Sequence, residues 1–194
     1  MFSTIELHVL INEIRDQEPN LVTIIKYFIK SYTFKTNEEL KEAVNLWNTN
    51  KLVCLRKYGH ISDWDVSKIT DMTDLFFRKS YFNDDISGWD VSNVKIMRYM
   101  FQGAQSFNQP LDNWDVSSVT DMELMFFNTK SFNQPLDNWD VSNVVNTSVM
   151  FYRATSFNQP LDDWDISNIK DMKSMFNEAE SFNQPETLKY FGIE

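Results

Sequence analysis

The sequence is poor in the residues that mark several common classes of protein. A single cysteine, Cys54, cannot form an internal disulfide, which excludes a disulfide-stapled secreted domain. Basic residues are too few for wholesale nucleic-acid binding, since 18 Lys and Arg stand against 28 Asp and Glu and the net charge is −10. No apolar run reaches the roughly 18 residues that span a bilayer. These absences predict a chain with no nucleic-acid partner and no membrane span.

Glycine and proline are also scarce, at four and five residues, whereas aromatic residues make up 15% of the 194 residues. This composition supplies more buriable surface than a disordered chain carries, so it predicts a packed core. The motifs of common enzymes are missing: there is no Gly-rich phosphate loop, HExxH helix, nucleophile elbow or Cys/His ligand set. We therefore expect a protein that is not an enzyme, with no catalytic, cofactor-binding or metal-binding residues and no cofactor.

A 25-residue repeat runs from residue 61 to residue 185 without an insertion. Its clearest marker is a series of tryptophans at constant spacing: Trp64, Trp89, Trp114, Trp139 and Trp164. Each tryptophan begins the motif WDVS or WDIS, a Met-Phe or Leu-Phe pair follows, and the last four units close on FNQP. One unit is too short to enclose a core, so neighbouring units must stack to bury their apolar residues.

Each unit predicts one strand and one short helix. Residues 111–116 follow a proline and are rich in branched and aromatic side chains, as at the start of a strand. Ser117 then stands where a helix N-cap is expected, and the apolar residues after it repeat at the spacing of one helix face. These residues are Val119, Met122, Met125 and Phe126. Stacking five such units predicts the α/β class and a short solenoid with one parallel strand per repeat.

Stacking also predicts columns of identical side chains. The tryptophans form one aromatic column, and a second contains Phe82, Phe107, Phe132, Phe157 and Phe182. A column of asparagine amides is expected to bond the backbone of neighbouring coils. Its members are Asn83, Asn108, Asn133, Asn158 and Asn183.

Stacking also places one aspartate of each repeat in a column, and another interaction must offset the repulsion between their charges. Its members are Asp65, Asp90, Asp115, Asp140 and Asp165. Our interpretation is that each carboxylate accepts hydrogen bonds from the serine turn that follows it. A calcium site that includes Asp112, Asp137 and Asp162 is the alternative, but the glycine-rich nonapeptide of calcium-binding β-rolls is absent.

The chain divides into three regions: a helical N-terminal cap or leader over residues 1–60, five repeats over residues 61–185, and a C-terminal tail or cap over residues 186–194. The acidity belongs to the repeats, which hold 19 acidic and nine basic residues. Helical spacing of apolar residues predicts two helices within residues 5–14 and 21–29. A third follows a capping box of Thr36 and Glu39, and a fourth runs from Lys51 to Tyr58 and stops at Gly59.

The repeat resembles the 25-residue units of the BspA-like leucine-rich-repeat surface proteins. The resemblance rests on the FNQPLxxWDVSxVxxMxxMF pattern and covers residues 61–185. It implies a right-handed, leucine-rich-repeat-like solenoid used for adhesion or protein binding, without catalytic residues. Unlike the bacterial surface members, this N-terminus shows no signal-peptide pattern, which favours a cytoplasmic or virion-associated location over secretion.

Binding residues are expected where the units differ, because positions that are identical in every unit serve the scaffold. The outer face of the predicted helix varies most, and five of its residues predict a protein-binding patch across the second to fourth units. They are Tyr99, Leu124, Phe127, Val149 and Tyr152. The alternative is that these side chains are partly buried against neighbouring coils.

The sequence therefore favours a non-enzymatic protein–protein interaction module that serves recognition or adhesion. A structural component of a larger assembly, such as a minor capsid or virion-associated protein, is an alternative, with contacts through the outer helix face or the ends of the solenoid. A third possibility is an adaptor whose N-terminal helices are F-box-like, although the Leu-Pro entry motif of that family is absent. The sequence does not identify the protein partner.

Overall fold

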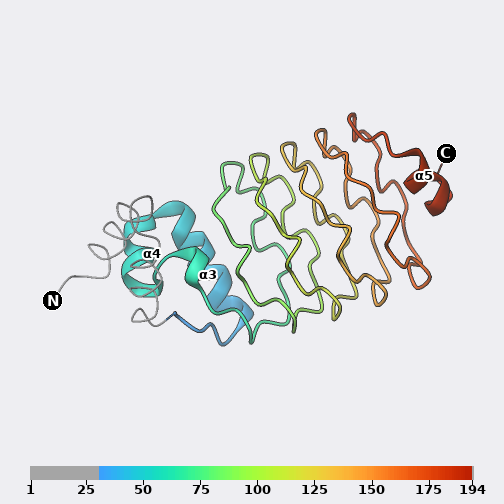
Figure 1. Cartoon of the computed structure of the whole chain (residues 1–194). Helices are drawn as coiled ribbons and strands as arrows, with labels where there is room; N and C mark the ends of the chain where they lie inside the picture. Colours follow the sequence, from blue (N-terminus) through green and yellow to red (C-terminus); the bar gives the residue numbers. More distant parts are fainter. Residues whose placement is uncertain (1–30, 194) are drawn as a thin grey trace, which may run out of the picture.

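The computed structural model describes residues 31–193. Helix α3 spans Asn37–Thr49, α4 spans Lys51–Tyr58, the 3-10 helix η1 spans Ile61–Asp63, and α5 spans Pro185–Phe191. Between η1 and α5 the chain winds into five stacked coils of 25 residues each, with α3 and α4 at one end of the stack and α5 at the other (Figure 1). The helices predicted within residues 5–14 and 21–29 lie outside the described residues.

Helices α3 and α4 confirm the sequence prediction for this region. The Thr36 hydroxyl accepts a hydrogen bond from the Glu39 backbone N–H at 3.2 Å, so it caps α3 as expected. Helix α4 ends at Gly59, whose φ of 77° a residue with a side chain rarely adopts. Cys54 is a buried core residue, and burial raises the pKa of its thiol to about 11.

Helix α3 packs against the first coil. The Trp47 indole N–H donates to the Asp84 carboxylate at 2.9 Å, and its ring meets the edge of the Trp64 ring at a centroid distance of 6.0 Å. Phe34 and Tyr58 also contact the Trp64 ring. One continuous core therefore joins the helices to the coils.

Backbone hydrogen bonds join each coil to the next at a constant register. In the first coil, four alternate N–H groups donate to carbonyls 24 residues further along, at 2.8–3.0 Å. These donors are Met72, Asp74, Phe76 and Arg78. The N–H groups between them close turns within the coil, for example from Leu75 to the Met72 carbonyl at 3.2 Å. We call residues 71–80 and their equivalents in the other coils the turn segments.

The predicted strand and helix of each repeat are wrong, and so is the leucine-rich-repeat-like α/β solenoid built from them. Within residues 31–193, β-pairing is limited to isolated parallel bridges such as Asp71 with Ile96, and no sheet forms. Residues 111–116 contain a turn closed by the Trp114 N–H and the Leu111 carbonyl at 3.0 Å. Residues 117–126 form successive turns instead of a helix.

The helix prediction failed because apolar residues three apart suit a succession of tight turns as well as a helix. An α-helix needs a run of N–H groups that all bond four residues back. In the turn segments every second N–H instead bonds the next coil, so that run does not exist.

Two positions in each turn segment adopt a left-handed backbone. Nine of these residues are not glycine: Asp74, Arg78, Tyr99, Leu124, Asn128, Val149, Arg153, Ser174 and Glu178. Such a conformation costs a residue with a side chain about 1–2 kcal/mol. In the first four coils the N–H groups at these positions bond the next coil, whereas Ser174 and Glu178 of the last coil adopt the same conformation without such bonds.

Tryptophan and phenylalanine columns fill the interior. Each tryptophan of the second to fifth coils donates its indole N–H to a carbonyl of the preceding coil, as Trp139 does to the Leu111 carbonyl at 2.9 Å. Two phenylalanine columns lie side by side, with ring centroids 5.3–6.1 Å apart along each column. The predicted phenylalanine column is one of them.

The asparagine column is confirmed as an amide ladder. The side-chain oxygens of Asn83, Asn108, Asn133 and Asn158 each accept a hydrogen bond from the backbone N–H of the asparagine one repeat further on, at 2.8–2.9 Å. The glutamine that follows each of these donors also bonds the preceding asparagine, at 3.0–3.1 Å to its side-chain oxygen. The FNQ sequence is therefore a connection between coils.

The last coil ends the backbone ladder. Four of its N–H groups stand at the donor positions of the other coils and have no hydrogen-bond partner among the described residues: Met172, Ser174, Phe176 and Glu178. Helix α5 covers the adjacent apolar end, where the Phe191 ring lies 6.2 Å from the Phe176 ring and Thr187 Oγ1 accepts from the Leu161 N–H at 3.2 Å. We call the row of four N–H groups the donor edge.

Replacing Trp139 with phenylalanine should lower the free energy of unfolding by about 2 kcal/mol, because the buried indole hydrogen bond and part of the ring contact are lost. Trp64→Phe is the matched control. Its indole bond to the Gly59 carbonyl is longer, at 3.3 Å, and only partly buried, so its loss should be smaller. Urea unfolding of both variants measures the difference, and equal losses would contradict a structural role for the Trp139 indole N–H.

Candidate functional site

The five residues predicted as a protein-binding patch come together on the outside of the turn segments. Tyr99, Leu124 and Val149 occupy equivalent positions in the second, third and fourth coils and form one column. Phe127 and Tyr152 form a second column three residues along, and their rings stack at a centroid distance of 5.2 Å. We call these five residues the outer patch.

All five side chains of the outer patch are partly buried, as the alternative interpretation of the sequence anticipated. Partial burial still leaves part of each side chain exposed. Tyr99, Leu124 and Val149 also lie in the left-handed region, with φ between 53° and 60°. Two features therefore constrain the patch: stacked rings and a backbone fixed by hydrogen bonds to the next coil.

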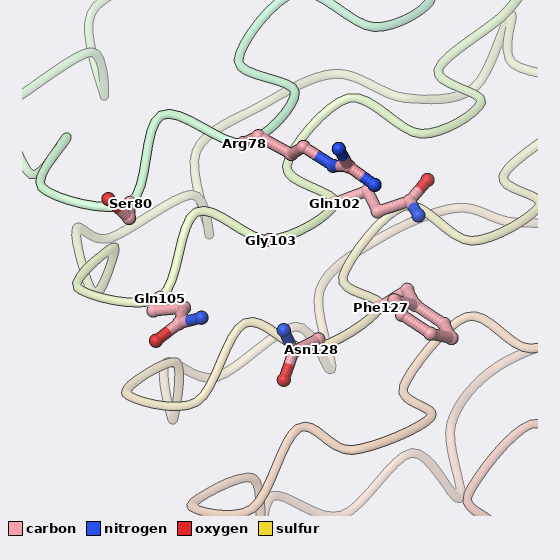
Figure 2. Close-up of a pocket in the computed structure, with 7 residues that line it drawn as sticks. All are labelled: Arg78, Ser80, Gln102, Gly103, Gln105, Phe127 and Asn128. Atoms are coloured by element: carbon pink, nitrogen blue, oxygen red, sulfur yellow. The ribbon is translucent and has the colours of Figure 1, made fainter.

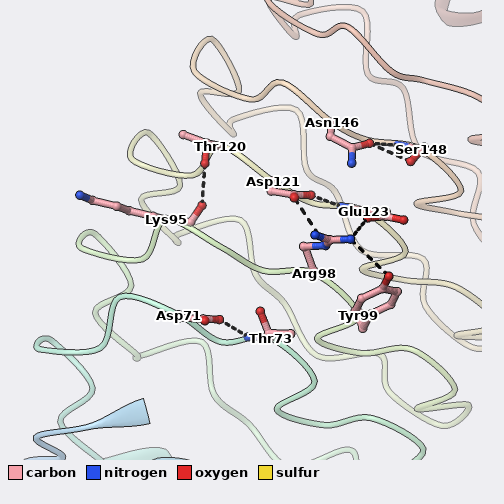
Figure 3. Close-up of polar contacts among 10 residues, drawn as sticks. All are labelled: Asp71, Thr73, Lys95, Arg98, Tyr99, Thr120, Asp121, Glu123, Asn146 and Ser148. Atoms are coloured by element: carbon pink, nitrogen blue, oxygen red, sulfur yellow. Dashed lines mark hydrogen bonds and ion pairs between the residues drawn. The ribbon is translucent and has the colours of Figure 1, made fainter.

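An ion-pair network lies at the Tyr99 end of the outer patch. The Arg98 guanidinium pairs with Asp121 and Glu123 of the next coil and lies near the Tyr99 ring (Figure 3). The Tyr99 hydroxyl accepts a hydrogen bond from Arg98 at 3.4 Å, and this bond, together with both carboxylates, raises the pKa of Arg98. The network holds Arg98 against the surface next to Tyr99.

A similar network lies at the other end. Arg153 pairs with Glu178 at 2.6 Å, and the Tyr152 hydroxyl donates to the same carboxylate. Both contacts lower the pKa of Glu178, with the Arg153 hydrogen bond as the largest cause. The patch is therefore flanked by a charged group at each end.

Our sequence reasoning missed both networks, although a signal was present. Arg98 and Glu123 are one repeat apart, and so are Arg153 and Glu178. In a stack with a 25-residue period, opposite charges at this separation lie side by side. The spacing was therefore enough to predict the pairs once stacking was accepted.

The aspartate column is held as the serine interpretation predicted. Asp65 Oδ1 accepts from the Ser67 N–H at 3.1 Å and from its hydroxyl at 2.6 Å, and the other members of the column accept from the serine two residues on. The serine bonds are the largest cause of the lowered pKa of Asp65, Asp140 and Asp165. Within residues 31–193, no three His, Cys, Asp or Glu side chains lie in an arrangement that could hold a metal ion.

The fold and the outer patch define a class of protein: an array of stacked 25-residue repeats with a uniform interior and a varied outer surface. The chain belongs to the family described as Mycoplasma protein of unknown function, DUF285, whose model matches residues 30–122, 54–148 and 109–190. No curated protein and no solved structure compared with the chain matches it. Among residues 31–193, none of the helices has both the length and the apolar character needed to cross a membrane.

Acid should destabilise the array partly through Asp65. Its folded-state pKa lies below the unfolded value of about 3.9, so the ionised carboxylate stabilises the fold above that pH. This contribution is lost as the pH falls through the folded pKa. Between about pH 5 and pH 3, the melting temperature of the Asp65→Asn variant should therefore fall less than that of the wild type.

The matched control is Asp137→Asn, which removes the same charge from an exposed position. Calorimetric melts across this pH range distinguish the two variants. If the melting temperatures of Asp65→Asn and of the wild type fall by the same amount on acidification, the serine bonds of Asp65 do not stabilise the fold.

Proposed function

We propose that this chain is a non-enzymatic protein–protein interaction module that contacts its partner through the outer patch. The observation that carries the proposal is the grouping of five large, partly exposed side chains from three coils, two of them stacked on each other. Clustered aromatic residues that are held rigid lose little entropy on binding and are enriched at the centres of interfaces. The proposal makes the outer patch the centre of the contact.

The flanking charges support the same function. Arg98 and Arg153 already pair with carboxylates of neighbouring coils, so a partner would not have to bury an unpaired cation there. Such a charged rim around an apolar centre is the usual anatomy of a protein interface. The resemblance of the repeat to BspA-like proteins, whose arrays serve adhesion or protein binding, also supports it.

Replacing patch residues with residues that the array itself uses at the same positions should abolish partner binding without unfolding the chain. The triple variant Leu124→Ser, Phe127→Gln and Tyr152→Asn takes its side chains from the positions of Ser174, Gln102 and Asn177. The matched control, Asp74→Ser with Asn177→Gln, makes similar changes in the same columns but outside the patch.

Affinity capture from the native source, with thermal melts of each protein, measures the outcome. We expect the control to retain the proteins that the wild type captures and the triple variant to lose them, with all three melting cooperatively. If the triple variant captures the same proteins as the wild type, the outer patch is not the interface.

The donor edge favours a second candidate, a structural component of a larger assembly. Four aligned N–H groups without partners among the described residues form an edge to which another chain can add. A virion-associated protein is one example of such a component. Light scattering after size-exclusion chromatography separates the two candidates, because a stable monomer over a wide concentration range would oppose the assembly. The F-box-like adaptor depended on residues 1–33, of which the structure describes only 31–33.

A further inference from the structure

An outward arginine in the first coil differs from the two that flank the outer patch. Arg98 and Arg153 each pair with a glutamate one repeat further on. Arg78 occupies the same position in its coil as Arg153 does, but the residue one repeat after it is Gly103, which has no side chain. Arg78 makes no ion pair with any residue in the described range 31–193, and its guanidinium lies 5.0 Å from the centre of the Phe77 ring.

A hollow of about 330 Å³ lies beside Arg78 and the Gly103 backbone (Figure 2). The coil keeps its register there, because the Gly103 N–H donates to the Phe127 carbonyl at 2.8 Å. Figure 2 shows the Arg78 guanidinium beside the Gln102 amide on one side of the hollow. The rest of the lining consists of Ser80, Gln105, Phe127 and Asn128.

The polar side chains around the hollow are free to bind. Within the part of the chain that the structure describes, the amides of Gln102, Gln105 and Asn128 have no hydrogen-bond partner. An unpaired guanidinium and three amides together offer several N–H donors around one cavity. This donor set suits an anionic group, and Phe127 supplies an apolar wall that it shares with the outer patch.

The surroundings of the hollow are basic, although the chain as a whole is acidic. At the equivalent positions of the first four coils, residues 77–81, 102–106, 127–131 and 152–156 contain no acidic residue. They contain four basic residues, of which the last is already paired with Glu178 of the fifth coil: Arg78, Lys79, Lys130 and Arg153. A basic strip on a chain with a net charge of −10 directs acidic partners to this place.

We propose that the hollow over Gly103 binds a carboxylate side chain of an acidic polypeptide segment, with Arg78 as its ion-pair partner. The carboxylate takes the place relative to Arg78 that Glu178 takes relative to Arg153. The amides donate to its remaining oxygen and to the backbone of the segment, while the aliphatic part of the side chain packs on Phe127. The inference rests on the proposed function, because it names the partner's chemistry at one edge of the outer patch.

The test uses a defined probe, the acetylated and amidated peptide Glu-Gly-Glu-Gly-Glu, with the corresponding glutamine peptide as its neutral match. Isothermal titration at low ionic strength should show binding of the glutamate peptide to the full chain and at least ten-fold weaker binding of the glutamine peptide. Arg78→Gln should weaken binding of the glutamate peptide by about ten-fold or more. Arg153→Gln removes the same charge from the same column, away from the hollow, and should weaken it by about two-fold at most.

Gly103→Glu provides a second variant. It supplies an internal carboxylate to Arg78 at a position where Glu178 adopts the same left-handed backbone, so the fold is expected to persist. Binding of the glutamate peptide should then fall as far as in Arg78→Gln, while the thermal melt stays cooperative. Nuclear magnetic resonance spectra of the arginine side chains should show the Arg78 Nε–H shifting toward that of Arg153.

The proposal is overturned if the two peptides bind equally, if Arg78→Gln and Arg153→Gln have equal effects, or if a neutral oligosaccharide such as maltotriose binds the hollow and the glutamate peptide does not. None of these results would contradict the proposal that the outer patch is the interface. Failure of the proposed function would appear instead as unchanged partner capture by the triple patch variant, so the two failures are distinguishable.

Discussion

The alternation of backbone hydrogen bonds in the turn segments is the constraint on which the rest of the array depends. Every second N–H group bonds the next coil, and the groups between them close turns within their own coil. This division satisfies the backbone without a helix or a sheet. It also fixes the 25-residue register, so that identical side chains stand in columns.

Fixed register divides the repeat into two kinds of position. Inward positions form the tryptophan and phenylalanine columns, where a change in side-chain volume disturbs the packing of the coils on both sides. Outward positions contact fewer neighbours and tolerate many residue types: the column of Tyr99 also contains an aspartate, a leucine, a valine and a serine. The backbone therefore acts as a scaffold on which outward residues vary without changing the fold, which is what a recognition surface requires.

The same register governs the electrostatics. Charges one repeat apart become neighbours, so Arg98 and Arg153 meet glutamates of the next coil, and the acidity of the repeats is partly balanced along the surface. The aspartates of the column carry like charges one repeat apart. Hydrogen bonds from the serine two residues further on stabilise each ionised carboxylate. The residue one repeat after Arg78 is Gly103, which offers no carboxylate, and Arg78 makes no ion pair within residues 31–193.

The sequence by itself determined the repeat, its period, the residues of each column, the asparagine ladder, and the helices that begin after Thr36 and end before Gly59. These features follow from local chemistry or from exact repetition, and neither requires knowledge of distant contacts. Only the tertiary structure decided that the apolar residues three apart belong to turns, since the acceptors of the alternate N–H groups lie 24 residues away in another coil. For the same reason it alone showed the hollow that Arg78, Gly103 and Phe127 line.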